Sequence, residues 1–218
     1  MSWLAVSGEM GRDLAFVLED LAGDPFTLGL IALAVLVVFT IGWIAVRRYR
    51  HTPGHSFQGV LAGREELAVL LHPNPDPDAM ATAMGVSLLA DAVGTEAEIY
   101  FPGEIRHQEN RAFRTVLDLE LTAIEGATDL SGDVVLVDHN EARDFTGARE
   151  LDPIAVVDHH PGSGTGSAFT DRRPEYGACA TIITEYLRAV GFEPHTEQST
   201  PAKHIPEPVA TGILYGIL

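Results

Sequence analysis

The chain has 218 residues, 46% of them hydrophobic, and carries a formal net charge of −17 from 31 acidic and 14 basic residues. This length suits one α/β domain with a buried core plus an appendage. So negative a chain is not suited to gripping long nucleic acid through many phosphate contacts, and it is typical of proteins from a high-salt cytoplasm, where salt screens the repulsion between carboxylates. The single cysteine, Cys179, excludes an internal disulfide framework and a cysteine-rich zinc site, and it fits a reducing compartment.

Residues 26–46 predict a membrane-spanning helix. The segment reads FTLGLIALAVLVVFTIGWIAV, without a charge, and so supplies the roughly 20 apolar residues that a helix needs to cross a bilayer. A buried core helix would carry a polar stripe, and a cleaved signal peptide would follow basic rather than acidic residues. Arg47, Arg48 and Arg50 come directly after the segment, so the positive-inside tendency predicts a single-pass protein of the cell membrane with its following domain in the cytoplasm.

The span divides the chain into four parts. Residues 1–25 form an amino-terminal tail that we expect outside the membrane or as a short interfacial helix. Residues 47–65 contain Pro53, Gly54 and Gly59 and predict a juxtamembrane linker, and residues 66–218 predict the folded domain. A single span of this kind also allows a homodimer.

The domain at 66–218 alternates strand patterns with helix patterns. Apolar runs predict strands at residues 66–71, 96–101, 133–137 and 154–158, and helical spacing predicts helices at 79–93, 106–117, 177–190 and 209–218, with a surface loop at 195–208. This alternation indicates an α/β fold with a parallel β-sheet that is flanked by helices and covered on both faces. Ligands of such sheets bind beyond the carboxyl ends of the strands.

Three of the predicted strands run directly into acidic residues or histidines. These residues are His72, Asp76 and Asp78 after the first strand, Asp138 after the third, and the triplet Asp158, His159 and His160 at the fourth. Asp78 taken alone could simply cap a helix, but a parallel sheet brings all three clusters to one edge. Rigid oxygen and nitrogen ligands suit Mn²⁺ or Mg²⁺, and two such cations about 4 Å apart activate water and stabilise a phosphoryl group.

The same residues resemble the motifs of a known family. HPNPDPDAM, VLVDHN and VVDHHPG are similar to motifs one, two and three of the DHH phosphoesterases, over about residues 66–218. This family includes RecJ-like nucleases, NrnA-like oligoribonucleases that also act as phosphoadenosine phosphate phosphatases, cyclic di-AMP phosphodiesterases and family II pyrophosphatases. The resemblance implies two divalent cations, usually Mn²⁺.

The resemblance also implies roles for individual residues. It makes His72 and Asp76 ligands of the first cation, Asp78 and His159 ligands of the second, and Asp138 the bridge between them. It gives catalytic roles to the remaining two residues of the triplet: His160 faces the substrate phosphate and Asp158 orients the site from behind.

The chain departs from the family pattern at its carboxyl end. In the family, a helix similar to residues 210–218 is followed by a fourth motif, an Asp before a Thr, and then by a smaller substrate-binding domain. This chain ends at Leu218. We therefore expect residues 66–218 to be a DHH domain truncated before the fourth motif and lacking the carboxy-terminal domain.

Basic residues at 106–111 are candidates for substrate contact. Arg106, His107 and Arg111 begin a predicted helix at the edge where the site should open, although a solvated helical turn would look the same. The glycine-rich segment at 162–167 lacks the Lys of a phosphate-binding loop and predicts a flexible connection.

These patterns predict a membrane-bound, metal-dependent phosphoesterase. Its expected substrates are phosphodiester or phosphomonoester bonds in small nucleotides or short oligonucleotides, such as nanoRNA, phosphoadenosine phosphate or a cyclic dinucleotide. One alternative is a catalytically impaired membrane-bound sensor of nucleotide or metal. A second is a manganese-dependent inorganic pyrophosphatase.

Overall fold

The computed structural model describes residues 25–50, 52–194 and 203–218, which divide into two compact units at Arg50. The first unit contributes helix α2, Pro25–Arg50. One stretch of it, Pro25–Ile44, is long and apolar enough to cross a membrane, and none of that stretch is buried. The Thr40 hydroxyl in this stretch donates to the Leu36 carbonyl at 2.7 Å, as hydroxyls do in apolar surroundings. The helix predicted at 26–46 is confirmed, and the tail predicted at 1–25 lies almost wholly outside the described residues.

The second unit is built on a six-stranded, fully parallel sheet with the order β3-β2-β1-β4-β5-β6. The strands are β1 Glu66–Leu70, β2 Glu96–Pro102, β3 Thr122–Ile124, β4 Asp133–Val137, β5 Ala155–Asp158 and β6 Phe169–Arg172. The helices are α3 Pro53–Leu61, α4 Pro77–Asp91, α5 Gln108–Val116, α6 Cys179–Ala189 and α7 Glu207–Ile217. The predicted parallel sheet flanked by helices is confirmed.

Two boundaries differ from the sequence prediction. Residues 47–65, expected as a linker, contain helix α3, whose Phe57 and Leu61 are fully buried. Pro53 starts the helix, and Gly54 lets it approach α6 so closely that a Cβ would lie 2.7 Å from Tyr186 Cα. Of the loop expected at 195–208, residues 195–202 lie outside the described residues, and His204–Ile205 forms β8, which pairs with β7, Glu193–Pro194.

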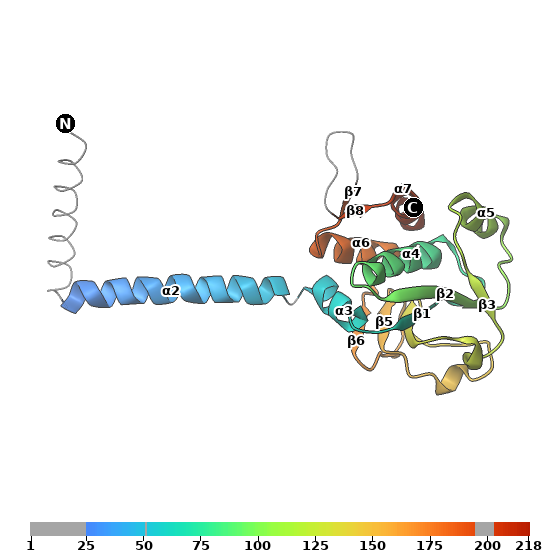
Figure 1. Ribbon diagram of the computed structural model, residues 1–218, viewed down its shortest axis with the longest axis horizontal. Coiled ribbons are helices and arrows are strands. Elements are labelled where there is room, and N and C mark those ends of the chain that lie inside the picture. The colour runs from blue at the N-terminus through green and yellow to red at the C-terminus, as the bar shows by residue number, and fades with distance from the viewer. Residues whose placement is uncertain (1–24, 51, 195–202) are drawn as a thin grey trace. The chain divides into compact units, whose positions relative to one another are not determined.

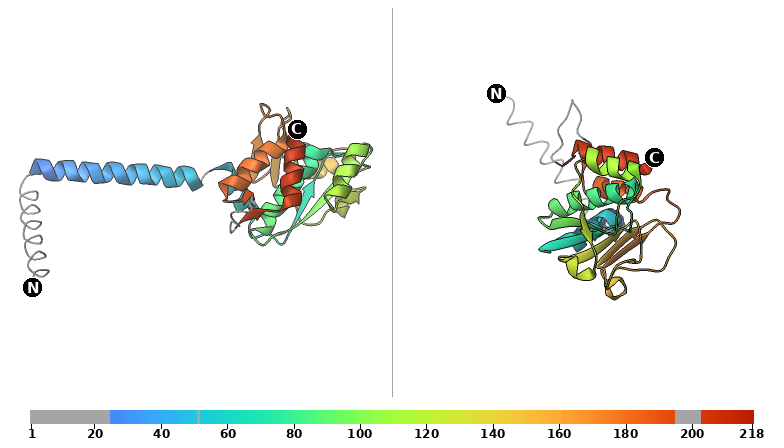
Figure 2. Two further views of the ribbon diagram at one scale, coloured as in Figure 1. Left: turned by 90° about the horizontal axis from the view of Figure 1, so that it is seen from above. Right: turned by 90° about the vertical axis from the view of Figure 1, so that its right-hand side faces the viewer.

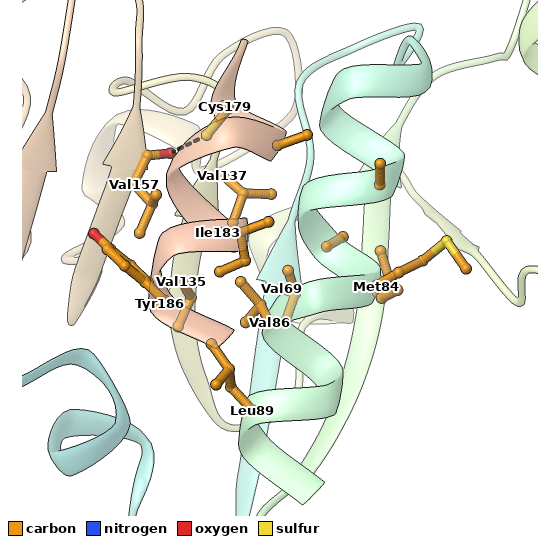
Figure 3. Packing of buried hydrophobic residues seen from close by; sticks show 14 of the residues in the cluster. Val69, Met84, Val86, Leu89, Val135, Val137, Val157, Cys179, Ile183 and Tyr186 are labelled. Atoms are coloured by element: carbon orange, nitrogen blue, oxygen red, sulfur yellow. Dashed lines mark hydrogen bonds between the residues drawn. The ribbon is translucent and has the colours of Figure 1, made fainter. Parts of the chain in front are cut away.

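The two faces of the sheet are covered in different ways. Helices α4, α6 and α7 lie on one side of it (Figure 1, Figure 2), and α4 and α6 pack Val86, Leu89, Ile183 and Tyr186 against the strand side chains in Figure 3. The opposite face is covered by loop residues Leu130, Ala142, Phe145 and Leu151 and by the 3-10 turns η1, Ala127–Asp129, and η2, Ala148–Glu150. Both faces are covered, as expected, but on this second face the cover is loop and 3-10 turn, since the β4–β5 connection folds as a loop with one 3-10 turn.

The burial of the strands follows from this two-sided cover. Val69, Val135 and Val157 face the helices, while Leu70, Leu136 and Val156 face the loops, as the two-residue period of a strand requires. A sheet buried on both faces explains why its central strands read as continuous apolar runs.

Strand register places the carboxyl ends of the central strands together. Leu70 of β1 pairs with Leu136 of β4, and Val137 of β4 pairs with Val157 of β5. The Asp138 amide extends this ladder by donating to the Val157 carbonyl at 2.9 Å. The residues that follow β1, β4 and β5 therefore meet at one edge of the sheet.

Candidate metal centre

The loop after β1 is held rigid by prolines and by its own side chains. Asp76 is the N-cap of α4, and its Oδ1 accepts from the Ala79 amide at 3.0 Å, with Pro77 in the first turn. Asn74 adopts a left-handed backbone (φ 53°), and its Oδ1 accepts from the Arg106 amide at 2.7 Å. The aspartate that caps this helix is thus Asp76.

Asp78 makes its contacts with a different helix. Its Oδ2 accepts from the Cys179 amide at 2.8 Å and its Oδ1 from the Ala180 amide at 2.7 Å, at the amino-terminal end of α6. Free amides at a helix start favour an anionic side chain. These bonds link the loop after β1 to α6.

Asp138 is the buried centre of the site. Its side chain is 1% exposed, and its backbone is left-handed (φ 60°), a conformation that Asp tolerates better than most residues. His72 Nε2 lies 3.5 Å from Oδ2, and His159 Nε2 lies 3.2 Å from Oδ1. Oδ1 has no hydrogen-bond partner while His159 Nε2 is unprotonated, and it faces a donor only when that nitrogen carries a proton. A buried carboxylate with unused lone pairs is a strong candidate for a cation ligand.

Both flanking imidazoles are oriented by backbone carbonyls. Nδ1 of His72 lies 3.0 Å from the Pro73 carbonyl, and Nδ1 of His159 lies 3.0 Å from the Tyr176 carbonyl. An Nδ1–H that donates to a carbonyl leaves Nε2 unprotonated in the neutral ring and ready to ligate a cation. In each ring that Nε2 is the atom facing Asp138.

The ligand atoms form two groups that share Asp138. His72, Asp76 and Asp138 make one group, and Asp138, His159 and His160 make the other, with ligand atoms within 4.8 Å of one another in each. Asp78 Oδ2 lies 3.5 Å from His159 Nε2 and so adjoins the second group. The residues fit divalent cations: oxygen and imidazole donors converge, and the shared carboxylate is otherwise unsatisfied.

The pKa shifts of these groups reflect carboxylates that lie close together in a buried site. Burial and the neighbouring Asp138 raise the pKa of Asp78 to about 6. A hydrogen bond to Asp138 raises the pKa of His159 to about 9, although burial opposes the shift. Burial alone would raise the pKa of Asp138, but the bonds from His159 and His72 lower it. Without a cation, a proton on an imidazole balances the buried carboxylate.

Asp158 holds His160 from behind. Asp158 is fully buried, and its Oδ1 accepts from the His160 amide at 3.1 Å and lies 2.9 Å from the His160 Nδ1. Its Oδ2 accepts from Asn140 Nδ2 at 2.5 Å. Asn140 thereby connects the loop after β4 to the end of β5.

The glycine-rich segment packs closely on Asn140. A Cβ on Gly164 would lie 1.6 Å from the Asn140 carbonyl oxygen, and one on Gly162 would lie 2.1 Å from Asn140 Oδ1. The Gly164 amide faces Asn140 Oδ1 at 3.4 Å. The segment expected as a flexible connection instead packs tightly against Asn140, beside the site.

A cavity of about 500 Å³ opens over the metal ligands. It is lined by His72, Asp76, Asp138, His139, Asn140, Glu141, Arg143, His160, Pro161 and Gly162. The three basic residues chosen from sequence do not line it. The Arg106 amide bonds Asn74, Arg111 donates to the Ile105 carbonyl at 3.0 Å, and His107 is the N-cap of α5. These contacts place the three residues on the α5 side of the loop after β1.

The loop after β4 supplies the lining residues that the sequence did not single out. His139 is buried, its Nδ1 lies 2.8 Å from the Val137 carbonyl, and burial lowers its pKa to about 4. Asn140, Glu141 and Arg143 follow it. Their position directly after a strand that ends in Asp138 was the available signal, because such loops line the ligand site of a parallel sheet.

Residues 66–217 match the DHH family, N-terminal domain. The chain belongs to the DHH family. The match covers the sheet, helices α4 to α7 and every candidate ligand of the two groups around Asp138, so the candidate metal centre lies wholly within the DHH domain.

Several proteins resemble this DHH domain. An uncharacterised protein of Methanocaldococcus jannaschii is 34% identical over 69% of this chain and 29% of its own length. A probable manganese-dependent inorganic pyrophosphatase of Deinococcus radiodurans is 37% identical over 59% of this chain and 35% of its own. The crystal structure of an exopolyphosphatase-related protein from Bacteroides fragilis has a TM-score of 0.48 at 15% identity, over 63% of this chain and 43% of that one. The chain thus spans about a third of the length of the two curated relatives.

Proposed function

We propose that this DHH-family chain is the membrane-tethered part of a two-metal phosphoesterase that hydrolyses phosphodiester or phosphomonoester bonds in small nucleotides or short oligonucleotides. The observation that carries the proposal is Asp138, a buried carboxylate shared by two groups of ligands at the carboxyl edge of the sheet. A site with two cations that share a carboxylate is suited to phosphoryl chemistry.

The proposed ligands divide between two cations. His72 and Asp76 would hold one, Asp78 and His159 the other, and Asp138 both; Mn²⁺ is favoured by the names of the relatives, with Mg²⁺ as the substitute. When bound, such cations supply Lewis acidity, which activates water and neutralises charge on a phosphoryl group.

The protein's own contribution centres on His160. The contact of its Nδ1 with Asp158 fixes the ring and leaves Nε2 as the nitrogen available in the cavity. From there His160 can bond a phosphate oxygen or protonate the leaving oxygen. Asp158, held in turn by Asn140, keeps the imidazole in that orientation.

The size and charge of the molecule favour small substrates. The cavity lies within the range of about 300–1,000 Å³ that is common for small-molecule sites, and the net charge of −17 disfavours long nucleic acid. The proposal places α2 across the cell membrane and the DHH domain in the cytoplasm, supported by the basic residues that end that helix.

Inorganic pyrophosphatase activity is a second candidate. It is favoured by one observation, the printed name of the Deinococcus radiodurans relative. A sensor that binds metal or nucleotide without turnover is the non-enzymatic alternative.

Hydrolysis assays with the full chain in detergent and Mn²⁺ test these proposals. The substrates are a short oligoribonucleotide, a nucleoside bisphosphate, a cyclic dinucleotide and pyrophosphate. Asp138→Asn is the key variant, because Asn tolerates the left-handed backbone at this position. It should lower the rate by more than the roughly 100-fold typical of an altered outer-shell residue.

Each result selects one interpretation. Cleavage of the nucleotides supports the main proposal, and exclusive cleavage of pyrophosphate supports the second. Binding of Mn²⁺ without hydrolysis of any substrate supports the sensor. Full activity of Asp138→Asn would rule out a shared metal ligand at this position.

A further inference from the structure

Arg143 lies in the loop after β4 and lines the same cavity as the metal ligands His72, Asp76 and Asp138. Its neighbours Ala142 and Phe145 pack against the hydrophobic cluster on the loop-covered face of the sheet. The backbone on either side of Arg143 is therefore anchored while its side chain is exposed. Binding a ligand would then order the Arg143 side chain without also having to order the backbone that carries it.

Arg143 is the only arginine or lysine among the residues that line this cavity. A guanidinium stays charged at all ordinary pH values, and its planar fork matches the oxygens of a phosphate. Of the three lining carboxylates, Asp76 and Asp138 belong to the metal groups, and Glu141 lies in the same loop as Arg143. A second anionic group on a ligand, away from the metals, would therefore find its permanent positive charge at Arg143.

The side chain of Arg143 is also uncommitted. No hydrogen bond or ion pair joins it to any of the described residues. By contrast, Arg173 bonds both Asp171 and Glu185 and thereby ties β6 to α6. Arg64 is paired with Asp133, and Arg172 donates to the Gly162 carbonyl. These three arginines hold the fold together, and the absence of such a bond at Arg143 leaves its donors free for a ligand.

We propose that Arg143 binds a second phosphate group of the ligand while the first lies at the metal ligands around Asp138. The ligand class is then small molecules with two phosphate groups, namely nucleoside bisphosphates and diphosphates. The inference rests on the proposed function for the position of the first phosphate. A bidentate guanidinium–phosphate contact would favour such ligands over monophosphates by about tenfold or more.

Isothermal titration calorimetry on the Mn²⁺-loaded full chain tests this inference through binding. The ligands are adenosine 5′-(α,β-methylene)diphosphate, whose P–C–P bridge resists hydrolysis, and adenosine 5′-monophosphate, which lacks the second group. The unchanged protein should bind the first at least about tenfold more tightly. Arg143→Ala should remove that advantage without weakening the monophosphate, and Arg143→Lys should keep part of it.

Arg188→Ala is the matched control, since Arg188 is an exposed arginine in the last turn of α6 that does not line the cavity. An advantage that survives equally in Arg143→Ala and Arg188→Ala, or that is absent from the unchanged protein, would overturn the inference even if phosphate esters are hydrolysed. An advantage that depends on Arg143 in a protein that hydrolyses nothing would uphold this contact and refute the proposed phosphoesterase.

Discussion

The two pairs of ligands that flank Asp138 come from similar residues but are held very differently. We call Asp78 and His159 the enclosed pair and His72 and Asp76 the open pair. Both oxygens of Asp78 accept backbone amides of α6, and its side chain is 14% exposed. Asp76 uses one oxygen to cap α4, and its side chain is 50% exposed toward the cavity.

Two aspartates in one short loop thus have opposite environments. Asp76 ends the loop as the N-cap of α4, whereas Asp78 lies in the first turn, next to α6. A ligand fixed before the cation arrives loses less entropy on binding. Under the proposed two-cation function, the difference predicts one strong, preformed cation site at the enclosed pair and a more readily exchanging one at the open pair.

The largest expected effect of this difference is on Mn²⁺ affinity. Asp76→Asn preserves the helix cap and the enclosed pair, so one tight site should remain. Asp78→Asn offers an NH₂ group where an α6 amide needs an acceptor, so only the weak site should remain. Calorimetric titration should give residual dissociation constants that differ by about 10–100-fold, the range for perturbed metal surroundings. Equal residual affinities would mean that the two pairs are equivalent.

A smaller effect is expected at the glycine-rich segment 162–167, which packs on Asn140. Gly164→Ala places a Cβ 1.6 Å from the Asn140 carbonyl oxygen, whereas Gly177→Ala meets nothing within 4 Å. Urea unfolding should show Gly164→Ala less stable by about 1–3 kcal/mol and Gly177→Ala nearly unchanged. Asn140 also bonds Asp158, so Gly164→Ala should weaken Mn²⁺ binding through the shift of Asn140. The effect should be smaller than that of either aspartate variant, because no candidate ligand is replaced. Unchanged stability of Gly164→Ala would show that the segment moves freely.

The smallest effect is a pH dependence that belongs to the enclosed pair. His159 has a pKa raised from 6.5 to about 9, so the metal-free fold is stabilised by its proton below pH 6.5 and loses that contribution as the pH rises through about 9. The raised pKa of Asp78 acts at lower pH, because its penalty develops between pH 3.8 and about 6. Between pH 6.5 and 9, the stabilisation by Mn²⁺ should therefore grow, since the cation replaces the departing proton.

Thermal unfolding with and without Mn²⁺ measures this change as a shift of a few degrees at most. His159→Gln should flatten the alkaline decline of the metal-free protein. His107→Gln is the control, since His107 is an exposed histidine at the start of α5, outside the ligand groups. A decline that persists in His159→Gln would assign the pH dependence to another group.

Much of the fold could be predicted from local patterns. The apolar runs before His72, Asp138 and Asp158 become β1, β4 and β5, and the helices predicted at 79–93, 177–190 and 209–218 become α4, α6 and α7. The short strand β3 was not predicted, because Thr122–Ile124 is too brief to show an alternating pattern. Helix α3 was missed because its prolines and glycines read as a linker, although Phe57 and Leu61 anchor it in the core.

For the candidate site, the sequence predicted the metal-ligand residues but not the basic residue that lines the cavity. The metal-ligand types lay in three motifs, and parallel pairing brings them together as expected. The basic residues at 106–111 were chosen for their charge and their place near the sheet edge, yet Arg143 is the one that lines the cavity. The one local signal was that Arg143 closely follows a strand ending in Asp138; which arginine reaches the cavity depends on the path of each loop and on what that loop packs against.

The sequence by itself determined the candidate ligand residues, strands β1, β2, β4 and β5 with helices α4 to α7, and the uncharged apolar stretch of α2, because each depends on neighbouring residues and short periods. The tertiary structure alone decided that Asp78 is fastened to amides of Cys179 and Ala180, that Asn140 supports Asp158, and that Arg143 faces the cavity. These contacts join residues far apart in the chain. They depend on strand register and on helix packing, which no local pattern records.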